Sequence, residues 1–202
     1  MIIIKVYIVN GKPESGKTTF EQRICDICRY DYDHIHSAVT FVKEIAQEIG
    51  WDGHSKTSRD RKFLSDLKDL MQEYNNSPLD DVVDYVDNLN YDYDDIYCEN
   101  TCCFIDSRED ADIEWLIEEL STRYEVKTVL VVNPNKEFYK LGNHADDSES
   151  KIKYDIIINN DSTLRDLSLK ALDFVEKENL LPKSLKNKYF DVDIFGNIDY
   201  LS

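Results

Sequence analysis

The sequence predicts an α/β fold, namely a three-layer α/β/α sandwich with a mainly parallel sheet. Runs rich in Val and Ile alternate with stretches of helical periodicity along most of the chain. Such alternation is typical of parallel strands joined by right-handed helical crossovers. A loop with two glycines also separates the first apolar run from the first helical stretch. The 202 residues fit one compact domain.

In the first half of the chain, two segments have strand character and four have helical spacing. Met1–Val9 is dense in Ile and Val, and Asn10 and Gly11 bound it, as expected for a buried strand. Gly50 follows the second helical stretch, where a C-terminal cap belongs. The expected elements are a strand at Met1–Val9, a helix at Lys17–Arg29, a short strand at His34–Ser37, and helices at Ala38–Ile49, Lys62–Tyr74 and Leu79–Leu89.

The second half continues the alternation and adds two irregular segments. Asn135–Lys151 is a long polar loop, and loops of this length in compact domains often serve as lids or binding elements. Lys177–Ser202 predicts a strand-like tail that packs on the sheet edge or on a partner. The expected elements are strands at Thr101–Ile105, Val126–Val132 and Tyr154–Ile158, and helices at Ala111–Tyr124 and Leu164–Glu176, the last with Asp161 or Ser162 as N-cap. We expect a domain at 1–178 and a tail at 179–202.

The charge balance excludes two classes of partner. The chain has 41 acidic and 24 basic side chains, a formal charge of −17, which repels nucleic-acid backbones and anionic lipid. Its longest apolar run, Met1–Val9, contains Lys5 and is far shorter than a membrane-spanning helix. We therefore expect neither a nucleic-acid nor a membrane partner.

The five cysteines fit a reducing cytoplasm better than a disulfide framework, because their number is odd and no secretory signal is apparent. Cys25 and Cys28 form a CxxC pair, and Cys98, Cys102 and Cys103 form a second group, so a zinc site is an alternative. Core packing is favoured, because the first pair shares a helical face with isoleucines.

The loop after the first strand has the sequence GKPESGKT and matches G-x-x-x-x-G-K-[ST] at every fixed position. A strand, a tight glycine loop and a helix N-terminus together cradle phosphate with backbone N–H groups. Lys17 is expected to reach the β- and γ-phosphates of a nucleotide, and the Thr18 hydroxyl to ligand Mg²⁺. The expected nucleotide-binding residues are Gly11, Lys12, Pro13, Glu14, Ser15, Gly16, Lys17, Thr18 and Thr19.

Asp106 ends an apolar strand, where open parallel sheets place their ligand crevice. Its carboxylate is expected to hold Mg²⁺ through water, and the alternative is a cap on the following helix, together with Ser107 and Asp110. Arg108 follows in the same loop and is a candidate phosphate ligand, with an ordinary surface ion pair as the alternative.

Arg59 and Arg61 open the helix expected near Lys62, with Lys56 close by, in the one locally basic stretch of the chain. Guanidinium groups at a helix start suit a second phosphate, and a solvated cationic face is the alternative.

These residues resemble the P-loop kinase family, and more closely the deoxynucleoside monophosphate kinases of bacteriophages and their bacterial relatives. The likeness spans about Ile2 to Phe174. It rests on GKPESGKT from Gly11, HIHSAVTFVKEIAQEIGWDG from His34, SRDRKFLSDLKDL from Ser58, FIDSRED from Phe104, NHADD from Asn143 and DIIINNDSTLRDL from Asp155.

The resemblance implies Mg²⁺-assisted transfer of the γ-phosphoryl group of ATP to a (deoxy)nucleoside monophosphate. Lys17, Asp106 and Arg108 would be catalytic, Ser37, Arg59, Arg61 and Arg108 would face the acceptor, and 134–151 would be a lid. Asn133 replaces an arginine that relatives often carry before this proline.

Two other functions remain alternatives: a P-loop ATPase or GTPase coupled to a protein partner, and a catalytically weak nucleotide-binding module. The sequence lacks the NKxD motif of switch GTPases. The expected partners are a nucleotide donor and a small phosphorylated acceptor, and a homodimer is left open.

Overall fold

The computed structural model describes residues 3–30, 34–55, 57–92, 100–135, 151–181, 189–193 and 198–201. Several sequence-based expectations fall outside the described residues. These are Lys56, Cys98, most of the lid at 134–151 with the NHADD motif, and parts of the tail at 182–188 and 194–197.

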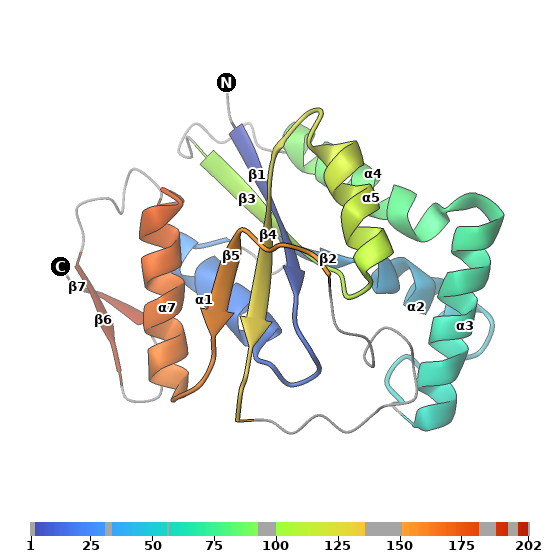
Figure 1. Ribbon diagram of the computed structural model, residues 1–202, viewed down its shortest axis with the longest axis horizontal. Coiled ribbons are helices and arrows are strands. Elements are labelled where there is room, and N and C mark those ends of the chain that lie inside the picture. The colour runs from blue at the N-terminus through green and yellow to red at the C-terminus, as the bar shows by residue number, and fades with distance from the viewer. Residues whose placement is uncertain are drawn as a thin grey trace.

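Five parallel strands form the central layer, in the order β2-β3-β1-β4-β5 (Figure 1). Neighbouring strands are parallel throughout, which confirms the predicted parallel sheet. In the central strand β1, Val6 and Ile8 pack on one face and Tyr7 and Val9 on the other, as a strand buried on both sides requires. The strands are β1 (Ile3–Asn10), β2 (Ile35–Ser37), β3 (Asn100–Asp106), β4 (Glu125–Val132) and β5 (Ile156–Asn159).

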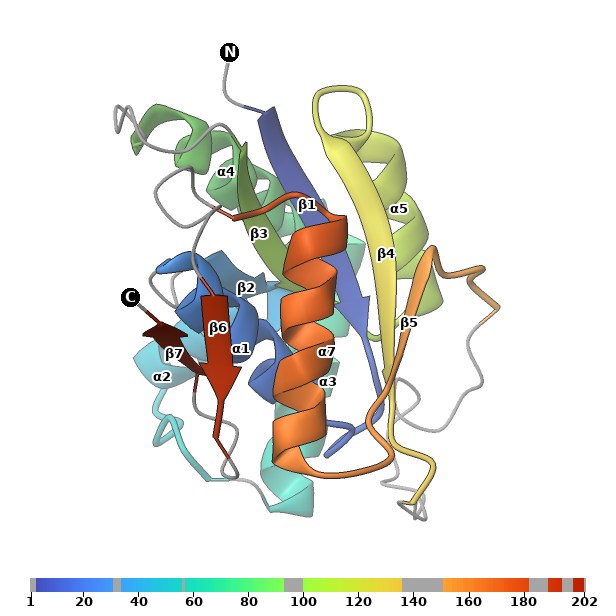
Figure 2. The ribbon, with the colours of Figure 1, turned by 90° about the vertical axis from the view of Figure 1, so that its left-hand side faces the viewer.

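Helices cover both faces of this sheet. Helices α1 and α7 lie on one face, and α4 and α5 pack on the other with the start of α2 (Figures 1 and 2). Helix α3 packs on α2 and α4. The expectation of three layers is thereby confirmed. The helices are α1 (Lys17–Cys28), α2 (Ala38–Glu48), α3 (Ser58–Asn75), α4 (Ser77–Asp92), α5 (Asp110–Leu120) and α7 (Leu164–Lys177).

Two helix starts differ from the sequence-based expectation. Helix α3 begins at Ser58 rather than near Lys62, because Thr57 and Asp60 form a capping box. Arg59 and Arg61 therefore lie in the first helical turn. Helix α7 has Thr163 as its N-cap, in a capping box with Asp166, so the assignment to Asp161 or Ser162 was wrong.

Two further helix boundaries differ. Helix α4 begins at Ser77 rather than at the expected Leu79, so Pro78 lies in its first turn, where the missing N–H of proline has no cost. Helix α5 ends at Leu120, earlier than the expected Tyr124.

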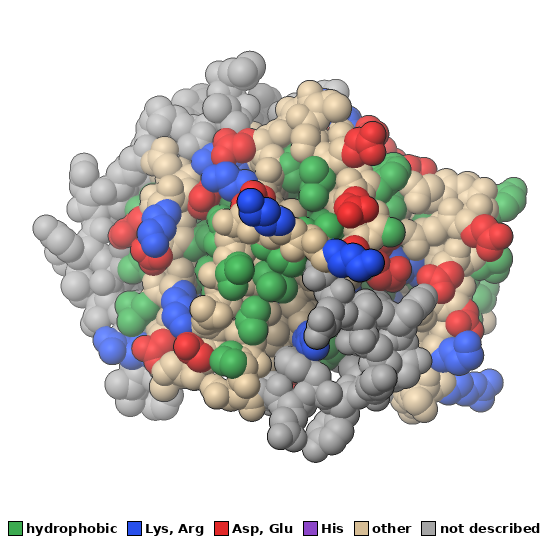
Figure 3. Space-filling model, viewed as in Figure 1, with side chains coloured by type: hydrophobic (Ala, Val, Ile, Leu, Met, Phe, Trp, Pro, Cys, Tyr) green, Lys and Arg blue, Asp and Glu red, His purple; other side chains and the backbone are tan. Residues whose placement is uncertain are grey.

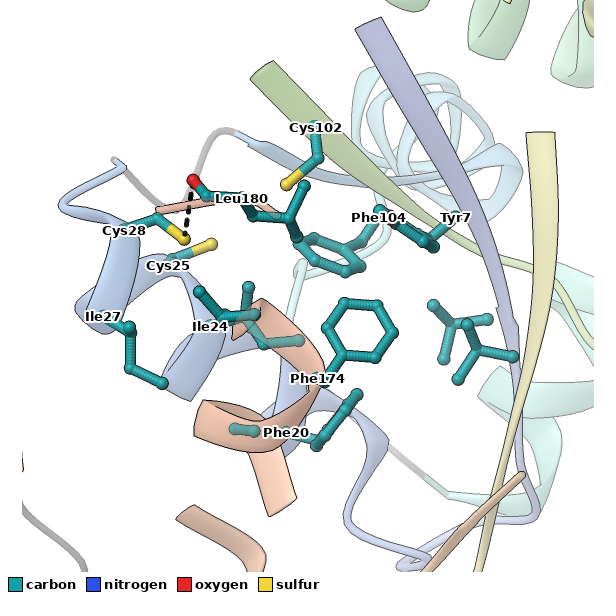
Figure 4. Packing of buried hydrophobic residues seen from close by; sticks show 14 of the residues in the cluster. Tyr7, Phe20, Ile24, Cys25, Ile27, Cys28, Cys102, Phe104, Phe174 and Leu180 are labelled. Atoms are coloured by element: carbon teal, nitrogen blue, oxygen red, sulfur yellow. Dashed lines mark hydrogen bonds between the residues drawn. The ribbon is translucent and has the colours of Figure 1, made fainter. Parts of the chain in front are cut away.

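The core on the α1 and α7 face contains three cysteines and a group of aromatic rings (Figure 4). Cys25, Cys28 and Cys102 are buried thiols that pack among Phe and Ile side chains, so the core interpretation is confirmed. Cys28 Sγ donates a weak hydrogen bond to the backbone oxygen of Leu180, at 3.8 Å. Burial raises the pKa of Cys102 well above its usual value, which keeps the thiol protonated and unreactive.

The core on this face continues past residue 178. Leu180 is 1% exposed and belongs to the same cluster as Tyr7. Glu178 caps the end of α7 and accepts hydrogen bonds at Oε2 from Tyr7 Oη (2.9 Å) and Lys127 Nζ (2.6 Å). Lys5 Nζ donates to the Glu178 backbone oxygen at 2.8 Å. The end of α7 is thus tied to β1 and β4.

The tail contains strands, as expected, but they do not extend the main sheet. Strands β6 (Tyr189–Val192) and β7 (Ile198–Leu201) pair antiparallel in a sheet of their own. Strand β6 contacts α7, and Figure 2 shows the hairpin beside that helix. These residues therefore contact the domain at α7 and form no extension of the main sheet. Among the described helices, none is long and apolar enough to cross a membrane.

Candidate functional site

The candidate site lies at the carboxyl ends of β1, β2 and β3, at the lower end of the sheet in Figure 1. The register pairs Asp106 with Val9 on one side and with Ser37 on the other. Because the strands are parallel, their carboxyl ends lie at one edge of the sheet. This edge therefore brings together Asp106, Ser37 and the loop that follows β1.

The loop from Gly11 to Gly16 requires glycine at both ends. A Cβ atom at Gly11 would lie 2.7 Å from the backbone oxygen of Val131, a clash with a fixed strand. Gly16 has a φ of 94°, in the left-handed region, and any Cβ there would also collide with Asn160. Asn160 Nδ2 donates to the Ser15 backbone oxygen at 2.9 Å, which fixes the loop against the end of β5.

Helix α1 starts directly from this loop without a side-chain cap. Its N-cap is Gly16, whereas the side chains of Ser37, Thr57 and Thr163 cap α2, α3 and α7. The positive end of the α1 dipole and its first N–H groups therefore lack the usual neutralising oxygen. Together with the glycine loop, this end of α1 suits an anion.

Lys17 and Asp106 meet at the start of α1. The Lys17 Nζ atom lies 2.6 Å from Asp106 Oδ2, and the two side chains are 10% and 21% exposed. The second oxygen of Asp106, Oδ1, is buried and has no hydrogen-bond partner. The alternative that Asp106 caps the next helix is wrong, because the N-cap of α5 is Glu109.

Glu21 lies one helical turn after Lys17 and is 0% exposed. When Glu21 is ionised, neither of its carboxyl oxygens has a hydrogen-bond partner. Burial, followed by repulsion from the Asp106 carboxylate, raises the pKa of Glu21 well above its usual range, and Lys17 offsets only part of this. A proton on Glu21 also allows a hydrogen bond with Asp106, which raises the pKa further.

A pocket of about 540 Å³ opens beside Lys17 and extends between α2, α3 and the β3–α5 loop. It brings together six residues that the sequence predicted for the site: Pro13, Lys17, Ser37, Arg61, Asp106 and Arg108. The pocket therefore joins the glycine loop to the two arginines expected to face an acceptor.

Arg59 does not line this pocket, so its predicted role in acceptor binding is not supported by its position. Residues two apart on a helix point about 200° away from each other, so Arg59 and Arg61 cannot share a face. The neighbouring Lys62 pairs with Asp66 at 2.8 Å on the exposed side of α3. For Arg59 and Lys62, a solvated cationic face is the better interpretation.

Several residues of the pocket wall were not predicted from the sequence. Lys43 comes from α2, and Lys68 from α3, seven residues after Arg61. That spacing of two helical turns is a signal in the sequence that could have identified Lys68. His36 also lines the pocket, pairs with Asp81 at 2.9 Å and stacks on Tyr85 with ring centroids 4.3 Å apart.

The surface around the site mixes both signs of charge. Figure 3 shows acidic and basic side chains interspersed over this face, with Lys and Arg gathered over the first turns of α3. In the part of the chain that the structure describes, no three His, Cys, Asp or Glu side chains are grouped as a metal site. Magnesium held through nucleotide phosphates needs only one or two protein ligands.

No family model matches the chain, and no curated protein matches it significantly.

Proposed function

We propose that this protein is a P-loop kinase that transfers the γ-phosphoryl group of ATP to a (deoxy)nucleoside monophosphate. The observation that carries the proposal is that Lys17, Asp106, Ser37, Arg61 and Arg108 all line the same pocket. A hydrolase needs only the first two of these groups. The arginines supply cations for the phosphate of a second substrate, and the resemblance to deoxynucleoside monophosphate kinases supports the same assignment.

The glycine loop and α1 would hold the donor. Backbone N–H groups of the loop and the start of α1 face the β- and γ-phosphates in this arrangement, and Lys17 exchanges Asp106 for a phosphate oxygen. The residues fit Mg²⁺, because the Thr18 side chain is at the surface and Asp106 has a buried oxygen without a partner. When bound, Mg²⁺ neutralises phosphate charge.

The transfer requires alignment rather than covalent participation of the protein. A phosphate oxygen of the acceptor attacks the γ-phosphorus, and the bond from that phosphorus to the β,γ-bridging oxygen breaks. ADP leaves with the bridging oxygen, and the acceptor becomes a diphosphate. Arg61 and Arg108 hold the acceptor phosphate, while Lys17 stabilises negative charge on the transferred group.

The test is an assay of ADP production with ATP, Mg²⁺ and a panel of ribo- and deoxyribonucleoside monophosphates. At least one acceptor should raise ADP production well above the acceptor-free rate and appear as the diphosphate. If none does, the kinase proposal is wrong. A high acceptor-free rate would instead favour the alternative of an ATPase coupled to a protein partner.

Replacing Arg61 or Arg108 by alanine should raise the KM for the acceptor by about tenfold, the effect of losing one charged hydrogen bond to phosphate. ATP affinity should change little, because both side chains line the acceptor end of the pocket. Arg59→Ala is the matched control: it removes the same charge from α3, but outside the pocket, and should leave the acceptor KM unchanged. An equal loss of ATP affinity would move Arg61 and Arg108 to the donor side.

A further inference from the structure

A buried cluster of charges joins α3 to the segment that follows β3. Lys68, with a side chain 8% exposed, places Nζ 2.7 Å from Asp112 Oδ2 and 2.8 Å from Glu109 Oε1. Gln72 Nε2 donates to the other oxygen of Asp112 at 2.8 Å. We call these four residues the Lys68 cluster. It fastens two turns of α3 to the start of α5.

The Lys68 cluster links the two segments that carry the arginines of the candidate acceptor site. Arg61 precedes Lys68 by two turns on the same face of α3, and Arg108 directly precedes Glu109 in the chain. Lys68, Glu109 and both arginines line the one pocket. The cluster therefore spans the gap between the two segments that carry Arg61 and Arg108.

The charges of the Lys68 cluster hold the Lys68 side chain in one place. Burial alone would lower the pKa of Lys68, but attraction and hydrogen bonding by Asp112, with help from Glu109, outweigh it and raise that pKa. Lys68 thus stays charged, and two of its three donors are directed by the carboxylates of Asp112 and Glu109. Two carboxylates against one ammonium leave a surplus negative charge, which by Coulomb attraction alone would weaken an anion site.

We propose that Lys68 is a positioning residue that fixes the spacing between Arg61 and Arg108, so that the pair accepts a phosphate monoester dianion. This proposal rests on the acceptor site of the proposed function, but not on phosphoryl transfer itself. Glu109 accepts a hydrogen bond from Lys68 and thereby holds the loop that carries Arg108. Asp112 joins Lys68 to α5.

The deciding variant is Glu109→Gln, because two explanations of Glu109 predict opposite results. If Glu109 were only a nearby negative charge, its removal would tighten the binding of a dianion. If it positions Arg108 through Lys68, replacing the ion pair by a weaker hydrogen bond to the glutamine oxygen should weaken binding about fivefold, since contacting residues of one network couple by about 1 kcal/mol. Glu109 is partly exposed and the Lys68–Asp112 pair remains, so this variant should fold.

The probe is inorganic phosphate, titrated calorimetrically into a Lys17→Ala background that weakens the phosphate loop. Binding that Arg108→Ala removes is assigned to the acceptor end. Asp66→Asn is the matched control, because it breaks an exposed ion pair with Lys62 on the same helix and should leave phosphate affinity unchanged. Lys68→Met should weaken phosphate binding at least as much as Glu109→Gln, provided that its circular dichroism remains native.

Weaker binding in Glu109→Gln with an unchanged control supports the proposal. Unchanged or tighter binding overturns it, and so does a parent protein whose phosphate binding does not depend on Arg108. The kinase proposal fails separately: if phosphate binding depends on Glu109 but no monophosphate is phosphorylated, the positioning role stands and the transfer reaction does not.

Discussion

Lys17→Ala should lower the rate of phosphoryl transfer by about 10³-fold, the scale expected when a preorganised charge-stabilising group is removed from a catalytic site. Lys17 is the one lysine of the glycine loop that lines the pocket, and it lies against Asp106, the candidate metal ligand. Alanine removes the positive charge and leaves the Asp106 carboxylate facing the phosphates. Both changes raise the free energy of a transition state that carries extra negative charge.

The measurement is the initial rate with the best acceptor at saturating ATP and Mg²⁺. Circular dichroism should remain that of the parent protein, because the loop backbone is held by Asn160 and by the glycines rather than by Lys17. Lys177→Ala serves as control, since it removes an equal charge from the exposed end of α7. A rate close to that of the parent in Lys17→Ala would refute the role of the loop in catalysis.

Glu21→Gln should stabilise the protein at pH 7 by about 1 to 3 kcal/mol, because glutamine removes the cost of taking up a proton on folding, which is about 1.4 kcal/mol for each unit by which the pKa is raised. Burial, followed by repulsion from Asp106, raises the pKa of Glu21, so the folded state keeps this proton to a higher pH than the unfolded chain, which releases it near its ordinary pKa of 4.5. The folded protein thus binds more protons than the unfolded one. Its stability must fall as pH rises above that value.

Glutamine has nearly the same shape and can donate the same hydrogen bond to Asp106 without this penalty. Urea unfolding of both proteins from pH 4 to pH 8 provides the measurement. The advantage of Glu21→Gln should be largest at high pH and shrink as the pH approaches 4.5, while Glu44→Gln, on the exposed side of α2, should show no such trend. A pH-independent difference would contradict the raised pKa.

The sequence predicted the order of strands and helices and the position of the glycine loop between β1 and α1, because both depend on local patterns. The glycine loop is a contiguous motif, and Val and Ile density marks buried parallel strands. The start of α3 was misplaced for a reason that is also local. Thr57 and Asp60 are spaced as a capping box, which marks a start at Ser58. The apolar spacing alone predicts a start near Lys62.

The remaining parts of the site could not be predicted because they arise from tertiary contacts. Glu21 has the pattern of a surface residue on an amphipathic helix, and only the packing of α1 beneath Asp106 buries it. Lys68 meets Glu109 and Asp112 across more than 40 positions of sequence. The choice between Arg59 and Arg61 depends on helix phase, which requires an accurate helix start.

The two faces of the sheet differ in when they can be completed during synthesis. On the α4 and α5 face, every fully buried core residue lies between Ile4 and Leu120. On the α1 and α7 face, the core also needs Leu167, Phe174 and Leu180, and Tyr7 finds its hydrogen-bond partner only at Glu178. Because a ribosome releases the chain from its N-terminus, β1 can be packed on only one of its two faces until about 170 further residues have emerged. We expect nascent chains stalled before α7 to expose the Tyr7 side of the sheet and to be the form that chaperones bind.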